Sequence, residues 1–559
     1  MRSSYNCLLI ADHNLDNFAA YLANDPAWPD IVPVKAGYGQ VIQALAAPRG
    51  GPEDRPIDLT VIWTRPEGTF ESFRRLSNFE AVSRDRILSE VDDFCDQIRQ
   101  YRNGLGTVFI PSWIMPAFNR GYEMLDLKEG QGIKNIILRM NLRLAERLGS
   151  DPGIFVLDCD PWIGAAGPHA FNPKAWYMGK LAFGNEVFKA ASRQIKSAFR
   201  GICGRAKKLV VVDLDDTLWG GIVGDVGWKA LHLGGPDPLG EAFADFQEAL
   251  KSLQNRGIIL AIVSKNDEAV ALEAIQSHPE MRLKLDDFAG WRINWSDKAS
   301  NLVDLVSELS LGLEAVVFID DNPAERARVK EALPDVLVPD WPEDKALYRK
   351  ALWDLDCFNN PALSAEDATR TQMYVSERKR EGLRKTVGSL EDWLKTIGLK
   401  VIVEDLNESN LPRAAQLLNK TNQMNLSTRR LSQPELEAWG DGPGRKLWTL
   451  RVSDKFGDSG LTGIISMEVE KQSARIVDFI LSCRVMGRRI EELMLAIAVQ
   501  EAGRLGLQEV QARYVMTSKN KTCLEFFQRS GFSVREETLY YWTLNREYPA
   551  PAHIETIRS

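Results

Sequence analysis

Short apolar runs alternate with longer stretches of helical periodicity through about the first 200 residues of the chain. The runs are continuously apolar, which is typical of parallel strands that are buried on both faces of a sheet. Helical spacing of apolar residues is clearest at 83–102 and 133–148. The predicted strands are residues 5–11, 58–63, 106–110 and 154–157. This alternation predicts an α/β layer fold.

The same rhythm restarts at Lys208 and continues through residues 258–264 and 315–321. A proline-rich segment at 338–343 follows these runs, and the next segment, 365–385, is charged and has helical character. Proline favours turns and ends regular elements, so we expect this second α/β block to end near that segment. The charged stretch is predicted to be a connector.

A third block follows, with apolar runs that indicate strands and with a helix predicted at 489–503. Its predicted strands are 399–404, 447–453, 461–469 and 474–481. A chain of 559 residues is too long for one hydrophobic core. We therefore predict an α/β protein with three domains and a helical linker. The predicted boundaries are 1–204, 205–360, 361–389 for the linker, and 390–559.

Composition and charge disfavour some classes of function. A hydrophobic content of 44% with 26% charged residues is ordinary for a soluble globular protein. The net charge of -8 argues against a general affinity for nucleic acid or an anionic membrane. The net charge does not exclude a local basic pocket that binds a phosphorylated ligand. The seven cysteines are scattered without a CxxC pair, and no apolar run reaches membrane-spanning length. Both features favour a cytoplasmic protein with reduced thiols.

An apolar strand ends abruptly in acidic residues in the segment VVVDLDDTLWGG. Asp213 and Asp215 are two positions apart, so their side chains would share a face if the strand continued. In an open parallel sheet the ligand site lies at the carboxyl ends of the strands. Neighbouring carboxylates repel one another and are costly to bury without a cation. Hard oxygen ligands favour Mg²⁺, which we predict as the cofactor.

Further polar residues follow apolar runs later in the block. They are Ser264 in IVSKN, Lys298 in NWSDKASN, and Asp320 and Asp321 in VVFIDDNP. An acidic run alone can be a solvated turn, but a serine, a lysine and an acidic pair in this order disfavour that interpretation. Together with Asp213 and Asp215, these segments resemble the four motifs of the HAD phosphotransferase superfamily.

The resemblance implies a role for each residue. Asp213 would attack phosphorus and form an aspartyl-phosphate, and Asp215 would protonate the leaving oxygen and then activate water. Ser264 and Lys298 would hold the phosphoryl oxygens. A lysine and a cation supply the charge neutralisation that phosphoryl transfer needs, and a carboxylate nucleophile divides hydrolysis into two easier steps. The implied Mg²⁺ ligands are Asp213, Asp215, Asp320 and Asp321.

A narrower resemblance, to the FkbH-like branch of this superfamily, extends over most of the chain. It is carried by VDLDDTLWGGIVGDVGW, FAGWRINWSDKASN, VFIDDNPAER, AGYGQVIQAL, FNPKAWYMGK and LLNKTNQMNLSTRR. The resemblance implies a small phosphorylated substrate. Characterised members take a phosphorylated glyceryl unit from 1,3-bisphosphoglycerate, remove phosphate and deliver the glyceryl group to an acyl carrier protein. Relatives with this domain order also appear in polysaccharide and other secondary biosynthesis.

The segment RVMGRR in the third block resembles the pyrophosphate loop of GNAT acyltransferases, and NKTCLEFFQRSGF resembles a later GNAT segment. Backbone N–H groups at a helix N-terminus suit a phosphate. The resemblance implies that Arg484, Gly487, Arg488 and Arg489 contact coenzyme A or a phosphopantetheine arm, although Arg489 replaces a small residue. Cys483 beside this loop is a candidate acyl-carrying thiol, whereas packing is the usual role of a free cysteine. A GNAT-like domain that serves only for docking is the alternative.

The first block resembles the SGNH-hydrolase-like domain of the same family, so the predicted fold is SGNH-like, HAD-like and GNAT-like in turn. An active hydrolase would carry a serine in the first loop, where this chain has Asp12, His13 and Asn14. We therefore expect substrate or carrier binding from this domain rather than hydrolysis. His169 could supply a site histidine, although a structural role is more common for a lone loop histidine.

Three functions remain open at this stage. The first is a phosphatase that also transfers a glyceryl or related acyl group to a carrier protein. The second is a stand-alone Mg²⁺-dependent phosphatase for a sugar phosphate or another small phosphomonoester, with a GNAT-like domain that acylates the product. The third is a scaffold with a vestigial site, which the complete set of acidic residues disfavours, because such residues are costly to bury without a metal.

Overall fold

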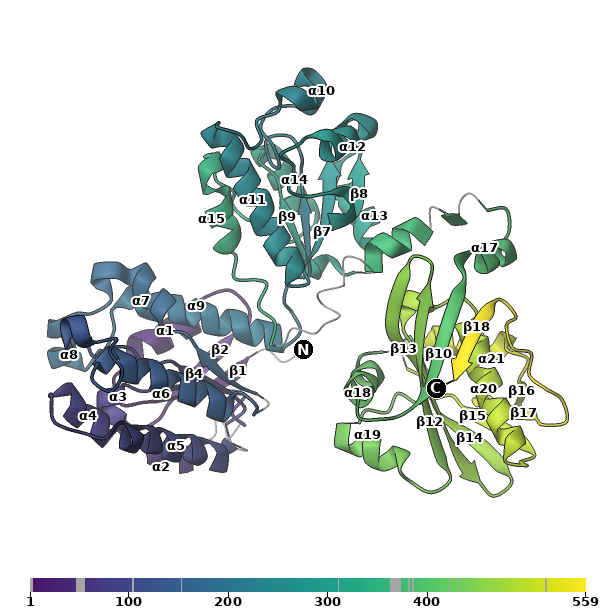
Figure 1. Ribbon diagram of the computed structural model, residues 1–559, viewed down its shortest axis with the longest axis horizontal. Coiled ribbons are helices and arrows are strands. Elements are labelled where there is room, and N and C mark those ends of the chain that lie inside the picture. The colour runs from purple at the N-terminus through teal and green to yellow at the C-terminus, as the bar shows by residue number, and fades with distance from the viewer. Residues whose placement is uncertain are drawn as a thin grey trace. The chain divides into compact units, whose positions relative to one another are not determined.

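The computed structural model of the chain is shown in Figure 1. It describes residues 4–46, 56–102, 105–151, 153–309, 311–361, 373–380, 383–384, 387–421, 423–431, 433–517 and 520–558. The chain divides into two compact units. The first comprises Met1–Lys208, Leu313–Val317 and Pro334–Leu363, and the second comprises Leu209–Gly312, Phe318–Leu333 and Ser364–Ser559. Within the described residues, no helix is both long and apolar enough to cross a membrane.

The N-terminal sheet is parallel, with strand order β2-β1-β3-β4-β5. Alternate residues of β1 face opposite layers: Leu8 and Ile10 pack with α5 and α6, and Cys7 and Leu9 pack with α1 and α9. Burial on both faces explains the continuous apolar runs. The strands are β1 (Tyr5–Ala11), β2 (Ile31–Lys35), β3 (Leu59–Trp63), β4 (Thr107–Pro111) and β5 (Ile154–Leu157). The main helices are α1 (Asp16–Asn24), α2 (Val41–Ala46), α3 (Pro66–Thr69), α4 (Glu71–Ser77), α5 (Arg84–Gln100), α6 (Ile133–Leu148), α7 (Asp160–Ala166), α8 (Pro173–Gly179) and α9 (Asn185–Ile202).

A second sheet follows, with strand order β8-β7-β6-β9. Its strands are again apolar and almost completely buried. They are β6 (Leu209–Val212), β7 (Ile259–Ser264), β8 (Phe288–Ile293) and β9 (Val316–Ile319). The helices are α10 (Val223–Val226), α11 (Pro238–Asn255), α12 (Glu268–Ser277), α13 (Lys298–Glu308), α14 (Pro323–Ala332) and α15 (Tyr348–Trp353).

Local capping fixes where the helices after these strands begin. The residues before α11, α12, α13 and α14 are Asp237, Asp267, Asp297 and Asn322, and each side chain accepts a hydrogen bond from an N–H group of the first turn. Such a cap stabilises a helix by about 1 kcal/mol. For α13 the cap sets the first turn in which Lys298 lies.

The C-terminal sheet is mixed, with strand order β16-β17-β15-β14-β13-β12-β10-β18, and β11 pairs with β14. Helices α20 and α21 pack on one face of this sheet, and α18 and α19 pack on the other. The strands are β10 (Leu399–Asp405), β11 (Met424–Asn425), β12 (Arg445–Asp454), β13 (Gly457–Glu470), β14 (Ser473–Leu481), β15 (Glu509–Arg513), β16 (Ser533–Glu536), β17 (Leu539–Thr543) and β18 (Ile554–Arg558). The helices are α17 (Leu390–Ile397), α18 (Leu411–Lys420), α19 (Gln433–Gly440), α20 (Ile490–Arg504) and α21 (Lys521–Arg529).

The predicted multi-domain α/β fold class is confirmed by these sheets. The predicted helix at 489–503 is α20, and the predicted strand at 474–481 is β14. In the predicted linker, residues 373–380 are helical, and part of the stretch at 365–385 lies outside the described residues. The short strands β11, β16 and β18 were not predicted, nor were β2, β8, β15 and β17, because a run of two to six residues gives little periodicity.

Candidate active site

The predicted phosphotransfer residues gather at the carboxyl edge of the β6–β9 sheet. Asp213 follows the last residue of β6, and Ser264 is the last residue of β7. Asp320 and Asp321 follow β9, and Lys298 opens α13 after β8. In a parallel sheet these strand ends form one edge, where open α/β folds bind their ligands. The four motif segments, although far apart in the sequence, therefore meet at one edge of this sheet.

Lys298 lies between two buried carboxylates. Its Nζ is 3.1 Å from Asp213 Oδ2 and 2.6 Å from Asp320 Oδ2. Burial alone would lower the pKa of the Lys298 ammonium, but the charges of Asp213 and Asp320 raise it above its ordinary value. Burial, followed by the neighbouring Asp213 charge, raises the pKa of Asp320 to about 6. The lysine therefore remains a cation beside the proposed nucleophile.

Among the described residues, one group of acidic side chains is close enough to hold a single cation. Carboxylate oxygens of Asp213, Asp320 and Asp321 lie within 4.8 Å of one another. Asp213 Oδ1 is buried and accepts no hydrogen bond within the described part of the structure. A buried carboxylate oxygen without a donor is costly unless a cation or ligand compensates it. The donor set is all oxygen, which fits Mg²⁺.

Neighbouring residues fix the turn that carries the acidic pair. The backbone N–H of Asp321 donates to Thr217 Oγ1 at 3.1 Å. Arg326 Nη1 donates to the carbonyl oxygens of Asp320 and Asp321 at 2.8 and 2.6 Å. Neither Thr217 nor Arg326 was predicted as a site residue, although Thr217 lies within the first motif and Arg326 lies within VFIDDNPAER.

The structure differs from the prediction that the Asp215 side chain is a metal ligand. The group of carboxylates just described does not include Asp215. Its Oδ1 accepts from Trp219 Nε1 at 2.9 Å and from the Val223 N–H at 3.1 Å, and its Oδ2 accepts from Asn266 Nδ2 at 2.8 Å. Burial is the main reason that the pKa of Asp215 is raised.

The reason for this difference is the early end of β6. The strand stops at Val212, and Asp216 adopts a left-handed backbone conformation with φ of 53°. The two-residue repeat that would place Asp213 and Asp215 on one face applies only within a strand. The Asp215 carboxylate therefore lies outside the group formed by Asp213, Asp320 and Asp321.

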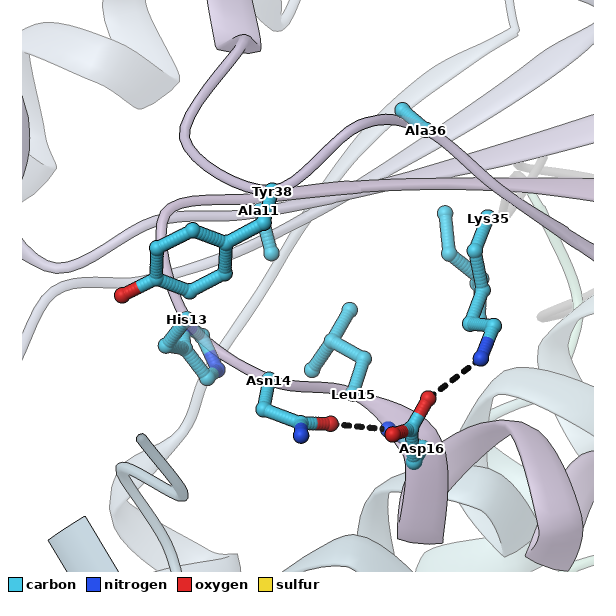
Figure 2. Close-up of a pocket in the computed structure, with 9 residues that line it drawn as sticks. Ala11, His13, Asn14, Leu15, Asp16, Lys35, Ala36 and Tyr38 are labelled. Carbon is cyan, nitrogen blue, oxygen red and sulfur yellow. Dashed lines mark hydrogen bonds and ion pairs between the residues drawn. The ribbon is translucent and has the colours of Figure 1, made fainter. Parts of the chain in front are cut away.

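Residues that follow β1 and β3 form a hydrogen-bonded cluster at the carboxyl ends of these strands. Asp12 accepts from the Arg65 N–H at 3.0 Å, from Arg65 Nε at 3.1 Å and from His13 Nδ1 at 3.1 Å. Burial is the main cause of the lowered pKa of His13. A pocket of about 200 Å³ beside the loop after β1 is lined by residues such as His13, Asn14, Lys35 and Tyr38 (Figure 2). His169 is exposed at the end of a separate 3-10 helix, Gly167–His169.

The arginine-rich segment predicted to bind a phosphate does join a strand to a helix, between β14 and α20. However, several of its hydrogen-bond donors already bond to other residues of the protein. The Gly487 N–H donates to Glu491 Oε1 at 3.0 Å, and Arg489 pairs with Glu492 at 2.6 Å. Arg484 Nε donates to Ser482 Oγ at 3.3 Å. The backbone donor that a phosphate would use is therefore bonded to a carboxylate from the first turn of α20. Cys483 begins a 3-10 helix here, and its side chain lies outside the described part of the structure.

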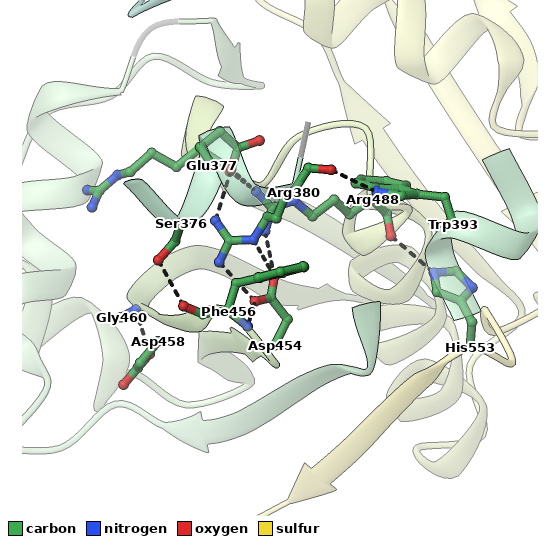
Figure 3. Close-up of polar contacts among 11 residues, drawn as sticks. Ser376, Glu377, Arg380, Trp393, Asp454, Phe456, Asp458, Gly460, Arg488 and His553 are labelled. Carbon is green, nitrogen blue, oxygen red and sulfur yellow. Dashed lines mark hydrogen bonds and ion pairs between the residues drawn. The ribbon is translucent and has the colours of Figure 1, made fainter. Parts of the chain in front are cut away.

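Arg488 belongs to a buried ionic cluster (Figure 3). Its Nη2 donates to Glu377 at 2.7 Å, and its Nη1 lies 3.4 Å from Asp454 Oδ2. Arg380 forms two hydrogen bonds to Asp454, at 2.6 and 2.9 Å. Burial is the main cause of the lowered pKa of Arg488. Arg488 thus ties the loop to residues 373–380 and to the β12–β13 hairpin.

We expect Asp454→Ala to destabilise this region strongly. The change leaves Arg380 and Arg488, both almost fully buried, without their shared carboxylate. Breaking a buried pair costs about 3–5 kcal/mol. The matched control is Arg451→Ala, which removes an exposed pair with Asp458 in the same hairpin and should cost less than about 1 kcal/mol. Urea denaturation monitored by circular dichroism measures the free energy of unfolding of both variants. Equal losses of stability in Asp454→Ala and Arg451→Ala would contradict the larger contribution expected of the buried cluster.

Comparisons with solved structures include a match that extends over more than half of the chain. The chain is similar to the N-terminal part of protein BF1531 from Bacteroides fragilis, which contains a phosphatase domain and was crystallised with Mg. The identity is 29%, the TM-score is 0.57, and the match covers 64% of this chain and 95% of that one. No family model and no curated protein matches the chain.

Shorter matches include acetyltransferases. A GNAT-family acetyltransferase from Staphylococcus aureus Mu50 is 12% identical over 26% of this chain and 99% of its own, with a TM-score of 0.21. Spermidine N-acetyltransferase from Vibrio cholerae, in complex with CoA and spermine, is 17% identical over 26% of this chain and 95% of its own, with a TM-score of 0.22. The structural neighbours thus include a phosphatase domain and GNAT acetyltransferases.

Proposed function

We propose that this protein is a Mg²⁺-dependent phosphatase whose nucleophile is Asp213. One observation carries the proposal: Lys298 lies between Asp213 and Asp320, beside a group of carboxylates in which Asp213 Oδ1 is buried without a donor. The similarity to a phosphatase domain complexed with Mg supports it. Asp213, Asp320 and Asp321 would hold the ion, which would offset negative charge on the phosphoryl group.

Four residues are proposed to have separate roles in the reaction. An Asp213 oxygen attacks phosphorus and forms the aspartyl-phosphate, while Lys298 neutralises charge on the transferred oxygens. Ser264, buried at the end of β7, is proposed to bind a phosphoryl oxygen. Asp215 gives its proton to the leaving oxygen and then takes one from the water that hydrolyses the intermediate.

The substrate we propose is a small phosphorylated glyceryl unit derived from 1,3-bisphosphoglycerate, with an acyl carrier protein as the acceptor of the glyceryl group. This part of the proposal rests on the FkbH-like resemblance of the motifs. It is tested by incubating holo-carrier protein with the enzyme, Mg²⁺ and 1,3-bisphosphoglycerate, followed by mass spectrometry of the carrier. A glyceryl adduct with release of inorganic phosphate supports the transferase, and an unmodified carrier contradicts it.

A second candidate, a phosphatase that acts without a pantetheine-bearing partner, is favoured by the C-terminal loop. There Glu491 engages the Gly487 N–H, and Glu377 with Asp454 engages Arg488. A phosphate that binds at this loop would have to displace carboxylates that already form charge-assisted hydrogen bonds, worth about 1.5–3 kcal/mol each.

Calorimetry with coenzyme A and with holo-carrier protein separates the two candidates. If the transferase is correct, the wild type binds one of these ligands, and Gly487→Asp weakens binding at least about tenfold because a carboxylate would face the phosphate. The matched control is Gly506→Asp, at a glycine with nearly the same backbone, φ of 72° against 75°, at the other end of α20. Absence of binding by the wild type would favour the second candidate.

A further inference from the structure

The two oxygens of the Asp215 carboxylate have different surroundings. Among the described residues, Oδ1 accepts from two N–H groups, those of Trp219 and Val223, and Oδ2 accepts from one, that of Asn266. A carboxylate oxygen offers about two lone-pair directions for hydrogen bonds. Oδ1 is therefore fully used by the protein, whereas Oδ2 keeps one direction for a proton that can be transferred.

The donors to Asp215 are themselves held in place. Asn266 is 4% exposed, and its Oδ1 accepts from the Asp267 N–H at 3.1 Å, so its NH₂ group faces Asp215. The Trp219 side chain is completely buried. Its backbone also forms a bridge with that of Asp215, which keeps the indole N–H beside Oδ1. The direction of the carboxylate is thus set from two separate segments, the loop after β6 and the loop after β7.

We propose that Asn266 and Trp219 are positioning residues for phosphoryl transfer, and that they direct Oδ2 of Asp215 towards the leaving oxygen. The inference rests on the proposed phosphatase function. In the first step an Asp213 oxygen forms a bond to phosphorus and the bond from phosphorus to the leaving oxygen breaks. The electron pair of that bond passes to the leaving oxygen, which takes the proton from Asp215 Oδ2.

In the second step the oxygen of a water molecule forms a bond to phosphorus, and the bond between phosphorus and Asp213 breaks, so the electron pair returns to the Asp213 carboxylate. Asp215 Oδ2 accepts the proton of that water. Both steps need Oδ2 in the same place, first as a donor and then as an acceptor. Hydrogen bonds from N–H groups to the carboxylate hold it there in both steps.

A leaving oxygen that is a strong base needs this proton, and a weakly basic one does not. Asn266→Leu and Trp219→Phe should therefore lower the turnover number for a primary alkyl phosphate, glycerol 1-phosphate, by about 10- to 100-fold. The rate at which p-nitrophenol is released in the first turnover should fall by no more than about threefold, since this leaving group departs without a proton. The later hydrolysis of the aspartyl-phosphate, which also uses Asp215, is the same step for both esters. The KM values for both esters should change little, because neither side chain is proposed to contact the substrate.

Matched controls remove similar hydrogen bonds elsewhere in the same domain. Gln254→Leu removes a buried amide that donates to the carbonyl of Asp287 at 2.9 Å, and Trp228→Phe removes an indole N–H that donates to Glu273 at 3.2 Å. We expect both controls to hydrolyse the two esters at rates close to those of the wild type. Because Asn266 and Trp219 are changed independently, the test does not depend on the folding of one variant.

A double-mutant cycle identifies a role that acts through Asp215. With Asp215→Asn in the background, Asn266→Leu should cause no further loss with glycerol 1-phosphate. Additive losses, or equal slowing of the first turnover with both esters by Asn266→Leu and Trp219→Phe, would show a merely structural role. That result would overturn the inference about positioning and leave the phosphatase proposal standing. A wild-type protein that hydrolyses neither ester in the presence of Mg²⁺ would overturn the phosphatase proposal as well.

Discussion

Asp213→Asn is expected to abolish phosphate release, with a loss of at least about four orders of magnitude, because an amide oxygen does not form a stable acyl phosphate with the substrate. The substitution also removes one of the mutually repelling carboxylates around Lys298, so the thermal stability of the metal-free protein should not fall. Release of inorganic phosphate from p-nitrophenyl phosphate measures the activity. Chelation of the metal by EDTA should abolish the activity of the wild type, and addition of Mg²⁺ should restore it.

The control for this prediction is Asp304→Asn, which changes an exposed aspartate on α13 of the same domain and should leave turnover near that of the wild type. Mass spectrometry of the wild type, quenched in acid during turnover, should detect one added phosphoryl group, and the Asp213→Asn protein should show none. Undiminished turnover in Asp213→Asn would exclude Asp213 as the nucleophile and remove the basis of the proposed mechanism.

Lys298→Met is expected to lower turnover by about two to three orders of magnitude for every ester, whatever its leaving group. The ammonium neutralises the transferred phosphoryl group, and this need does not depend on the leaving oxygen. The change also leaves Asp213 and Asp320 facing each other without the ammonium between them, so their mutual repulsion is no longer offset by Lys298. Turnover numbers for p-nitrophenyl phosphate and glycerol 1-phosphate measure the effect.

The matched control is Lys251→Met. Lys251 lies on α11 of the same domain and pairs with Asp287. Its side chain is 40% exposed, so its loss should have little effect on turnover. Equal slowing of both esters by Lys298→Met contrasts with the leaving-group dependence expected for Asn266→Leu. A loss below about tenfold, or one confined to glycerol 1-phosphate, would contradict the proposed role of Lys298.

The sequence by itself determined the α/β class and the edge of the sheet at which the phosphotransfer residues meet. Apolar runs that end in Asp213, in Ser264 and in the Asp320–Asp321 pair place these residues at strand ends, and parallel strands bring such ends together. Each of these signals is local in the chain and has a regular period, so no tertiary contact is needed to find it.

Only the tertiary structure decided how the remaining polar groups are used. The turn at Asp216 leaves the Asp215 carboxylate outside the group of metal-binding candidates. Asn266, 51 residues along the chain, donates a hydrogen bond to Asp215 instead. The tertiary structure likewise neutralised Arg488 with Glu377, 111 residues away. The physical reason is that a buried charge or hydrogen-bonding group takes whichever partner the packing brings within about 3 Å, and sequence spacing does not encode that distance.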